Sequence, residues 1–99
     1  MIRILCVDDH FVVREGIAAI VNRDEGMKVV AFAANGAEAL EEFRTHRPDV
    51  VLMDLKMPGH SGFDIIRAIR QVDPSACIIV LTMYSGDADR WRAVQAGAS

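Results

Sequence analysis

Oxygen-bearing side chains stand at the ends of three apolar runs in this sequence. Asp8 and Asp9 follow the first run, Asp54 follows the second, and Thr82 follows the third. If these runs are parallel strands of one sheet, the side chains converge on one crevice, because the carboxyl ends of parallel strands lie at the same edge. Three carboxylates gathered there repel one another, and a hard divalent cation such as Mg²⁺ relieves that repulsion. With a cation beside it, Asp54 can act as a nucleophile, so the leading interpretation is an aspartyl phosphate.

Each of these residues also has an ordinary structural explanation. Adjacent acids such as Asp8 and Asp9 are common at a helix N-terminus, where the helix dipole favours negative charge. Asp54 alone would suit a turn, and Thr82 alone would suit an ordinary strand. Their joint placement at three run ends favours a functional site. The histidines share no metal-ligand spacing, and only His10, beside the acidic pair, is placed to influence the pocket.

Composition predicts one soluble, folded domain. The chain has 99 residues, of which 52% are hydrophobic and 25% are charged, which excludes a disordered protein. The longest apolar stretch is too short to cross a bilayer, so no membrane association is expected. The first residues lack the small-residue cleavage site of a signal peptide, and we expect a cytoplasmic location.

Charge and cysteine usage narrow the possible partners. Eleven basic and 14 acidic residues give a net charge of −3, and no basic cluster is visible, so direct nucleic-acid contact by this chain is not expected. Cys6 and Cys77 lie within apolar runs and show no C-x-x-C spacing. Both are therefore predicted to be buried free thiols.

Apolar runs of strand length alternate with segments of helical period. Strands are expected over residues 2–7, 27–33, 50–53 and 77–82. The run at 50–53 is uniformly apolar, which is typical of a central parallel strand covered on both faces. Residues 56–62 are predicted to form a turn-rich loop at the rim of the crevice.

Four helices are expected between and after these strands. The first ends near Arg23, the second begins at an Asn35 N-cap and runs through Arg44, the third follows the loop, and Asp87 opens a fourth that Gly97 can cap. The side chains predicted to face inward are Val13, Ile17, Ile20 and Val21 in the first helix, Ala39, Leu40 and Phe43 in the second, and Ile65, Ile66 and Ile69 in the third. Successive strand-helix units of this kind predict an open parallel sheet with right-handed crossovers.

Three motifs at the strand ends resemble the receiver domain of bacterial two-component response regulators. They are Val7-Asp8-Asp9, Met53-Asp54-Leu55-Lys56-Met57-Pro58-Gly59 and Val80-Leu81-Thr82. The resemblance runs through all 99 residues, and the segments 81–84 and 96–99 resemble the subfamily in which the receiver precedes a LuxR-type DNA-binding domain. The resemblance implies an α/β, flavodoxin-like, doubly wound parallel sheet, with strand order 2-1-3-4-5 in the family. Residues 1–99 are then one receiver domain, and no DNA-binding domain is expected within them.

The resemblance also implies a role for each site residue. Asp54 accepts a phosphoryl group from a phosphohistidine on a sensor histidine kinase, and regulation of transcription follows through an output domain. Asp9, Asp54 and the backbone carbonyl of Lys56 ligate Mg²⁺ directly, while Asp8 acts through a bound water. Thr82 hydrogen-bonds the phosphoryl group, and the Lys56 and Tyr84 side chains flank it. Such a domain is a signalling module rather than an enzyme, and at most it catalyses its own phosphorylation and dephosphorylation.

The sequence departs from the family pattern at its end. Receivers carry a fifth strand that ends in a lysine which pairs with the phosphoryl oxygens, followed by a fifth helix, whereas this sequence stops at Ser99. We therefore expect strand order 2-1-3-4 without the fifth strand and helix. The alternative interpretation is a truncated, switch-defective interaction fragment that dimerises without productive phosphorylation.

This topology carries a consequence for the sheet surface. With right-handed crossovers the first helix covers one face and the later helices cover the other, so half of the first face is bare. The strand at 77–82 is also an apolar open edge, which favours pairing with another chain. We expect a homodimer or an element-swapped dimer.

Two other function classes share a parallel sheet. A phosphatase-type hydrolase with an aspartate nucleophile carries a second acid two residues later, and Lys56 stands at that place. A flavin-binding electron carrier needs a hydroxyl- and glycine-rich phosphate loop after the first strand, whereas the acidic segment 8–11 would repel a phosphate. Both classes are disfavoured.

Overall fold

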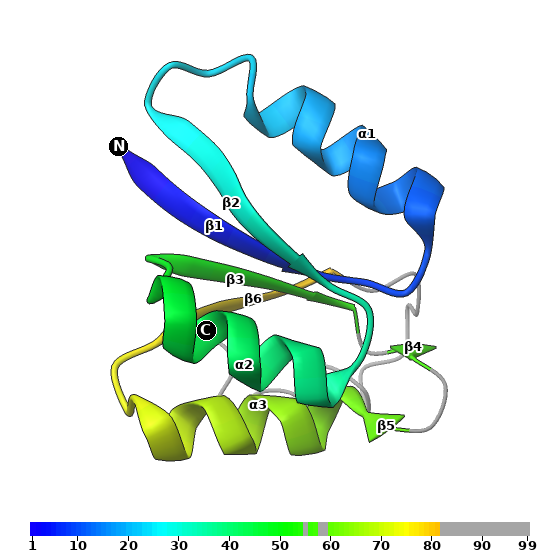
Figure 1. Ribbon diagram of the computed structural model, residues 1–99, viewed down its shortest axis with the longest axis vertical. Helices are drawn as coiled ribbons and strands as arrows, with labels where there is room; N and C mark the ends of the chain where they lie inside the picture. The colour runs from blue at the N-terminus through cyan, green and yellow to red at the C-terminus, as the bar shows by residue number, and fades with distance from the viewer. Residues whose placement is uncertain (55, 58–59, 82–99) are drawn as a thin grey trace.

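A four-stranded parallel sheet forms the centre of the protein (Figure 1). The computed structural model describes residues 1–54, 56–57 and 60–81. Across the sheet the strands are ordered β2 (Met27–Ala33), β1 (Ile2–Val7), β3 (Val50–Asp54) and β6 (Cys77–Leu81). Every pairing among them is parallel. The predicted order 2-1-3-4 is therefore confirmed.

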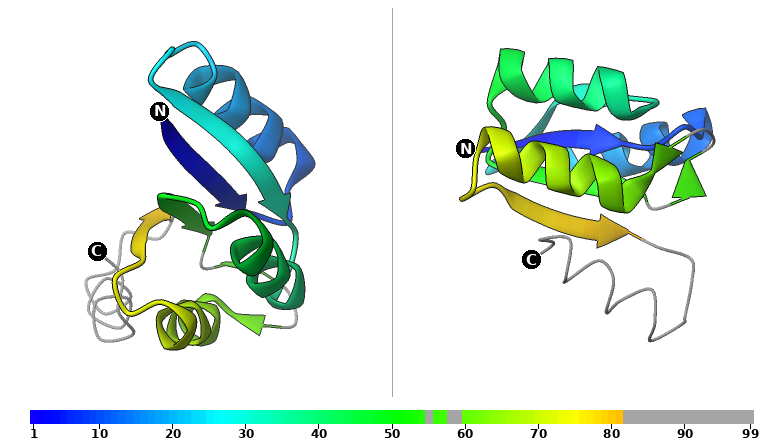
Figure 2. Two further views of the ribbon diagram at one scale, coloured as in Figure 1. Left: turned by 60° about the vertical axis from the view of Figure 1, so that its left-hand side comes forward. Right: turned by 90° about the horizontal axis from the view of Figure 1, so that it is seen from below.

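Three described helices cover the two faces of this sheet. Helix α1 (Phe11–Val21) lies on one side, and α2 (Gly36–His46) and α3 (Gly62–Val72) lie on the other, as Figures 1 and 2 show. This split follows from right-handed crossovers, because the chain adds β2 on one side of β1 and then adds β3 and β6 on the other side. None of the three has the length and hydropathy needed to cross a membrane.

Helix α2 begins where the sequence predicts. Asn35 accepts a hydrogen bond from the backbone N–H of Glu38 (2.9 Å), and the Glu38 carboxylate accepts in return from the backbone N–H of Ala34 (3.4 Å) and from the Asn35 amide (3.2 Å). The first bond satisfies a backbone donor that a helix start leaves without an intrahelical partner, and the other two fix the Glu38 side chain over the residues that precede the helix. The helix ends in a left-handed residue, Arg47, at φ 46°, directly before Pro48. Residues 35–47 thus form a helix that is capped at both ends.

The larger core cluster lies between the sheet and the pair α2 and α3. Ala39 and Phe43 are buried there, as predicted, while Leu40 is half-buried. Ile65, Ile66 and Ile69 of α3 are buried as predicted. This cluster fixes β1 and β3 from one side and so positions the ends of both strands.

The prediction for the inward face of α1 is wrong for two of its four residues. Val21 is buried and Ile17 is half-buried, but Val13 is 43% exposed and Ile20 is 69% exposed. The smaller core cluster explains the difference, because α1 packs on the sheet through Ile17, Ala18 and Val21. An apolar stripe is buried only along the part that faces a neighbouring element.

The segment after Asp54 differs from the predicted loop. β4 (Lys56–Met57) pairs antiparallel with β5 (His60–Ser61), and α3 begins at the next residue. Backbone pairing here does not depend on an alternating apolar pattern, which explains why sequence periodicity did not predict it. The predicted fourth helix, from Asp87, and the last residue of the fourth predicted strand, Thr82, lie outside the described residues.

Both cysteines are free thiols. Cys6 is buried, as predicted, whereas Cys77 is only half-buried. Burial is the main reason that the pKa of Cys6 is raised to about 11, and the nearby Asp8 charge adds to it. The Cys6 thiol is therefore protonated at neutral pH, in keeping with a packing role.

Candidate functional site

Two adjacent strands carry the acidic residues to one edge of the sheet. β1 ends at Val7, which is paired with Met53 of β3, so Asp8 and Asp54 are the next residues of neighbouring parallel strands. The backbone N–H of Asp8 donates to Ala33 O (2.9 Å), which extends the pairing with β2 by one residue. The carboxylates are therefore held at the carboxyl end of the sheet by backbone pairing.

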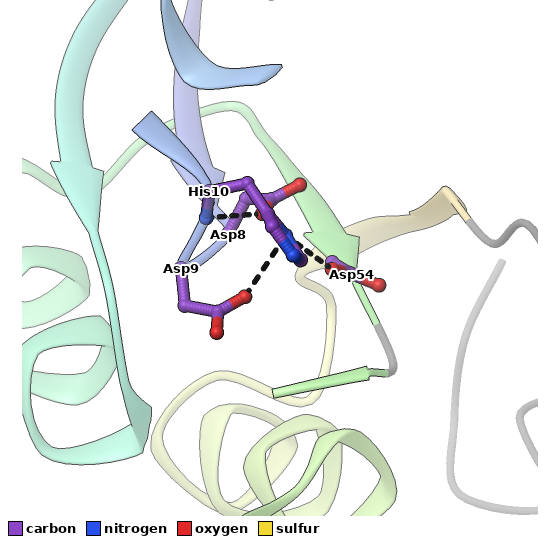
Figure 3. Close-up of side chains that lie close together, drawn as sticks. All are labelled: Asp8, Asp9, His10 and Asp54. Atoms are coloured by element: carbon purple, nitrogen blue, oxygen red, sulfur yellow. Dashed lines mark hydrogen bonds and ion pairs between the residues drawn. The ribbon is translucent and has the colours of Figure 1, made fainter. Parts of the chain in front are cut away.

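The predicted convergence of the three aspartates is present in the structure (Figure 3). One carboxylate oxygen from each of Asp8, Asp9 and Asp54, together with a ring nitrogen of His10, lies within 4.8 Å of the others. The side chains of Asp8, Asp54 and Asp9 are 8%, 13% and 23% exposed, respectively. Negatively charged carboxylates at this spacing repel one another, so a positively charged group in the pocket would be stabilised.

His10, at the N-cap position of α1, supplies such a group when its ring is protonated. Its Nδ1 lies 2.9 Å from Asp8 Oδ1, 3.1 Å from Asp9 Oδ1 and 3.9 Å from Asp54 Oδ2. The hydrogen bond with Asp8, followed by the charge of Asp9, raises the pKa of His10 above its ordinary value of 6.5. The sequence placed this residue beside the acidic pair, and the structure places its ring among the carboxylates.

Arg14 is a site residue that the sequence analysis missed. Its guanidinium donates to the backbone carbonyl oxygen of Asp8 (3.3 Å). The bond links the first turn of α1 to the end of β1 and brings a positive charge to the edge of the acidic cluster. The available signal was its spacing: Arg14 is one helical turn beyond the N-cap His10, and its backbone N–H bonds to His10 O (3.0 Å).

The donor set fits a hard cation. Asp9 Oδ1 is buried and has no hydrogen-bond partner among the described residues, although His10 Nδ1 is close enough to attract it electrostatically. A buried carboxylate oxygen without a hydrogen bond is costly, and coordination to a cation would offset that cost. Carboxylate oxygens are also the ligands that Mg²⁺ prefers. Asp8, Asp9 and Asp54 can therefore hold a magnesium ion.

The other predicted site residues are described only in part. Lys56 is the first residue of β4, two positions after Asp54. Thr82 and Tyr84 lie outside the described residues. The roles of these three residues remain predictions.

Comparison with known proteins identifies similar sequences over the whole chain. The family model for the response regulator receiver domain matches residues 4–99. The response regulator GacA of Pseudomonas viridiflava is 41% identical over 99 residues, covering 100% of this chain and 46% of that protein. The oxygen regulatory protein NreC of Staphylococcus haemolyticus is 42% identical over 97 residues, covering 97% and 45%. The chain thus spans less than half the length of these curated relatives.

Solved structures with the same fold include two informative neighbours. A LuxR-family two-component response regulator from Aurantimonas sp. SI85-9A1 superimposes with a TM-score of 0.96 at 45% identity, covering 100% of this chain and 71% of that chain. A CheX-CheY-BeF3-Mg²⁺ complex from Borrelia burgdorferi gives a TM-score of 0.92 at 25% identity, covering 99% and 74%. The flavodoxin-like fold expected from the sequence is confirmed by these neighbours.

Proposed function

Because the chain belongs to the response regulator receiver domain family, we propose that it accepts a phosphoryl group on Asp54 from a phosphohistidine of a sensor histidine kinase. The observation that carries this proposal is the meeting of the Asp8, Asp9 and Asp54 carboxylates at the end of β1 and β3. Only Asp54 belongs to β3, and its side chain is 13% exposed, so it is held by the sheet yet open to an incoming group.

The proposed transfer is a direct displacement at phosphorus. An Asp54 carboxylate oxygen forms the new bond to phosphorus, the phosphorus–nitrogen bond of the donor breaks, and its electron pair remains on the histidine ring. Asp8, Asp9 and Asp54 would hold Mg²⁺, together with the backbone carbonyl of Lys56, and Thr82 would hydrogen-bond the transferred group. When bound, the ion neutralises charge that develops on the phosphoryl oxygens. Support for this assignment comes from the CheY complex, which contains BeF3 and Mg²⁺.

The proposed output is regulation of transcription in the cytoplasm. The relatives GacA and NreC are regulators more than twice as long as this chain, and the Aurantimonas neighbour is a LuxR-family protein. We place this chain at residues 1–99 of the same kind of regulator, with DNA contact made by an output domain outside these residues. In that role it is a signalling domain, and any catalysis is confined to its own phosphorylation and dephosphorylation.

Intact-mass measurement tests the phosphoryl transfer. The protein is incubated with Mg²⁺ and acetyl phosphate, and we expect one phosphate adduct that is lost in Asp54→Asn. Asp64→Asn is the matched control, since it makes the same chemical change on an exposed side chain of α3. An adduct that persists in Asp54→Asn would assign the acceptor elsewhere and refute the proposal.

A second candidate function is an interaction fragment that dimerises without productive phosphorylation. It is favoured by apolar side chains on the sheet and on α1, because Ile79, Leu81 and Ile20 are 42%, 39% and 69% exposed. A second copy of the chain packed against β6 would bury Ile79 and Leu81, and one packed against α1 would bury Ile20. Sedimentation at rising protein concentration tests the idea: a dimer with Mg²⁺ binding but no phosphate adduct supports it, and a monomer throughout rejects it.

A further inference from the structure

We propose that the His10 ring and Mg²⁺ compete for the same carboxylate oxygens, so that the ring must leave the pocket when the ion binds. The inference concerns this chain's own histidine and rests on the proposed function, because it takes Asp8, Asp9 and Asp54 as the residues that hold the ion. It makes His10 a positioning residue that sets the affinity of the site.

The position of the ring is the first observation. His10 Nδ1 lies 2.9 Å from Asp8 Oδ1 and 3.1 Å from Asp9 Oδ1, and it is 3.9 Å from Asp54 Oδ2. One nitrogen therefore faces an oxygen of all three aspartates at once (Figure 3). In this arrangement the ring nitrogen stands among the oxygens that a shared cation would coordinate.

The coordination chemistry of magnesium explains why the two occupants exclude each other. Mg²⁺ requires nearly octahedral geometry with ligands at about 2.0–2.1 Å, and it usually keeps several of its waters. An imidazole among the carboxylates takes the space that these waters need. Magnesium also prefers oxygen to imidazole nitrogen, so the ring is displaced rather than retained as a ligand.

The attachment of His10 allows this displacement. Its side chain is 60% exposed, and it makes no capping hydrogen bond to α1. The turn at Asp8 is held by a second donor to the same oxygen, because the backbone N–H of His10 also donates to Asp8 Oδ1 (2.8 Å). The ring can therefore swing towards solvent while the backbone at the end of β1 keeps its conformation.

The competition does not depend on the charge of His10. It requires only that Nδ1 carries a hydrogen, which holds for the protonated ring and for one of the two neutral tautomers. In either form the ring occupies the same position among the carboxylates.

Calorimetric titration with MgCl2 provides the test. We expect His10→Ala to bind Mg²⁺ about two- to ten-fold more tightly than the wild type, the range expected on removing one hydrogen bond to the carboxylates. His46→Ala is the matched control, because His46 also pairs with a carboxylate (Glu42, 3.1 Å) but lies at the end of α2. The His46→Ala variant should bind Mg²⁺ with the same affinity as the wild type.

Nuclear magnetic resonance of the wild-type protein supplies a second measurement that needs no variant. Addition of Mg²⁺ should move the ring signals of His10 towards those of a solvent-exposed histidine and leave those of His46 unchanged. Weaker Mg²⁺ binding by His10→Ala would show that the ring is a ligand and overturn the inference. Equal affinities, or ring signals that do not move, would also overturn it while leaving the phosphoryl transfer intact. Absence of Mg²⁺ binding in all three proteins would instead refute the proposed magnesium site, and this inference with it.

Discussion

Replacement of Asp9 by asparagine should stabilise the protein when divalent cations are removed. The Asp9→Asn change keeps the shape of the side chain and removes one of three negative charges whose oxygens lie within 4.8 Å of one another. Two unit charges at that distance repel by about 0.9 kcal/mol even in a medium as polar as water. Asp9 takes part in two such pairs, one with Asp8 and one with Asp54.

The expected gain is smaller than the sum of the two repulsions. The Asp9 side chain is 23% exposed, so salt screens part of the repulsion. Protonated His10 also attracts Asp9, and this attraction opposes the gain. Because the pKa of His10 is raised, the attraction is fully present below the ordinary value of 6.5 and fades as the pH rises through the raised value. At a pH above the raised pKa of His10 we therefore expect a net stabilisation of about 1 kcal/mol.

Urea unfolding in EDTA measures this difference. A gain of about 1 kcal/mol corresponds to a rise in Tm of about 4–8 °C for a domain of this size, so thermal unfolding gives an independent reading. Glu25→Gln is the control, since it removes the same charge from an exposed residue in the turn between α1 and β2. With millimolar MgCl2 the order should reverse, because Asp9→Asn removes a ligand and the wild type gains more from the ion. A variant that is less stable than the wild type in EDTA, or that matches Glu25→Gln, would refute the reasoning.

Two further predictions concern packing and titration away from the pocket. Phe43→Ala should lower the free energy of unfolding by about 3–5 kcal/mol in urea, because the ring is 1% exposed in the larger core cluster. Phe32→Ala, at a ring that is 39% exposed, should cost clearly less, and equal losses would contradict the assigned burial. The Ser75 hydroxyl (2.7 Å) and the Ser75 N–H (3.0 Å) donate hydrogen bonds to Asp73 and lower the pKa of its carboxyl group below the ordinary value of 3.8. These bonds therefore stabilise the fold fully above pH 3.8, and the stabilisation is lost as the pH falls through the lowered pKa of Asp73. Ser75→Ala should move the pKa of Asp73 part of the way back in a carbon-detected NMR titration, and an unchanged titration would show that the hydroxyl does not contribute.

Local sequence determined the strands of the parallel sheet, the start of α2 and the placement of the acidic residues, but not the β4–β5 pair. Apolar runs marked the four strands of the parallel sheet, and the spacing of Asn35 and Glu38 marked the start of α2. Asp8 and Asp54 were placed correctly because each stands at the carboxyl end of its strand, Asp8 directly after β1 and Asp54 as the last residue of β3, and the strand fixes its position. Periodicity and strand ends are properties of short segments, so they can be determined without knowledge of the rest of the fold.

Only the tertiary structure decided how much of the α1 face is buried and which side chains join the three aspartates in the pocket. Val13 and Ile20 continue the apolar stripe of α1, yet both are exposed, because burial depends on what packs opposite the helix. The His10 ring lies among three carboxylates, and Arg14 bonds to the carbonyl of Asp8, because the end of β1, the start of α1 and the end of β3 meet at one edge. The contact with Asp54 joins segments that are distant in the chain, and the local contacts of His10 and Arg14 with Asp8 depend on how the turn between β1 and α1 folds.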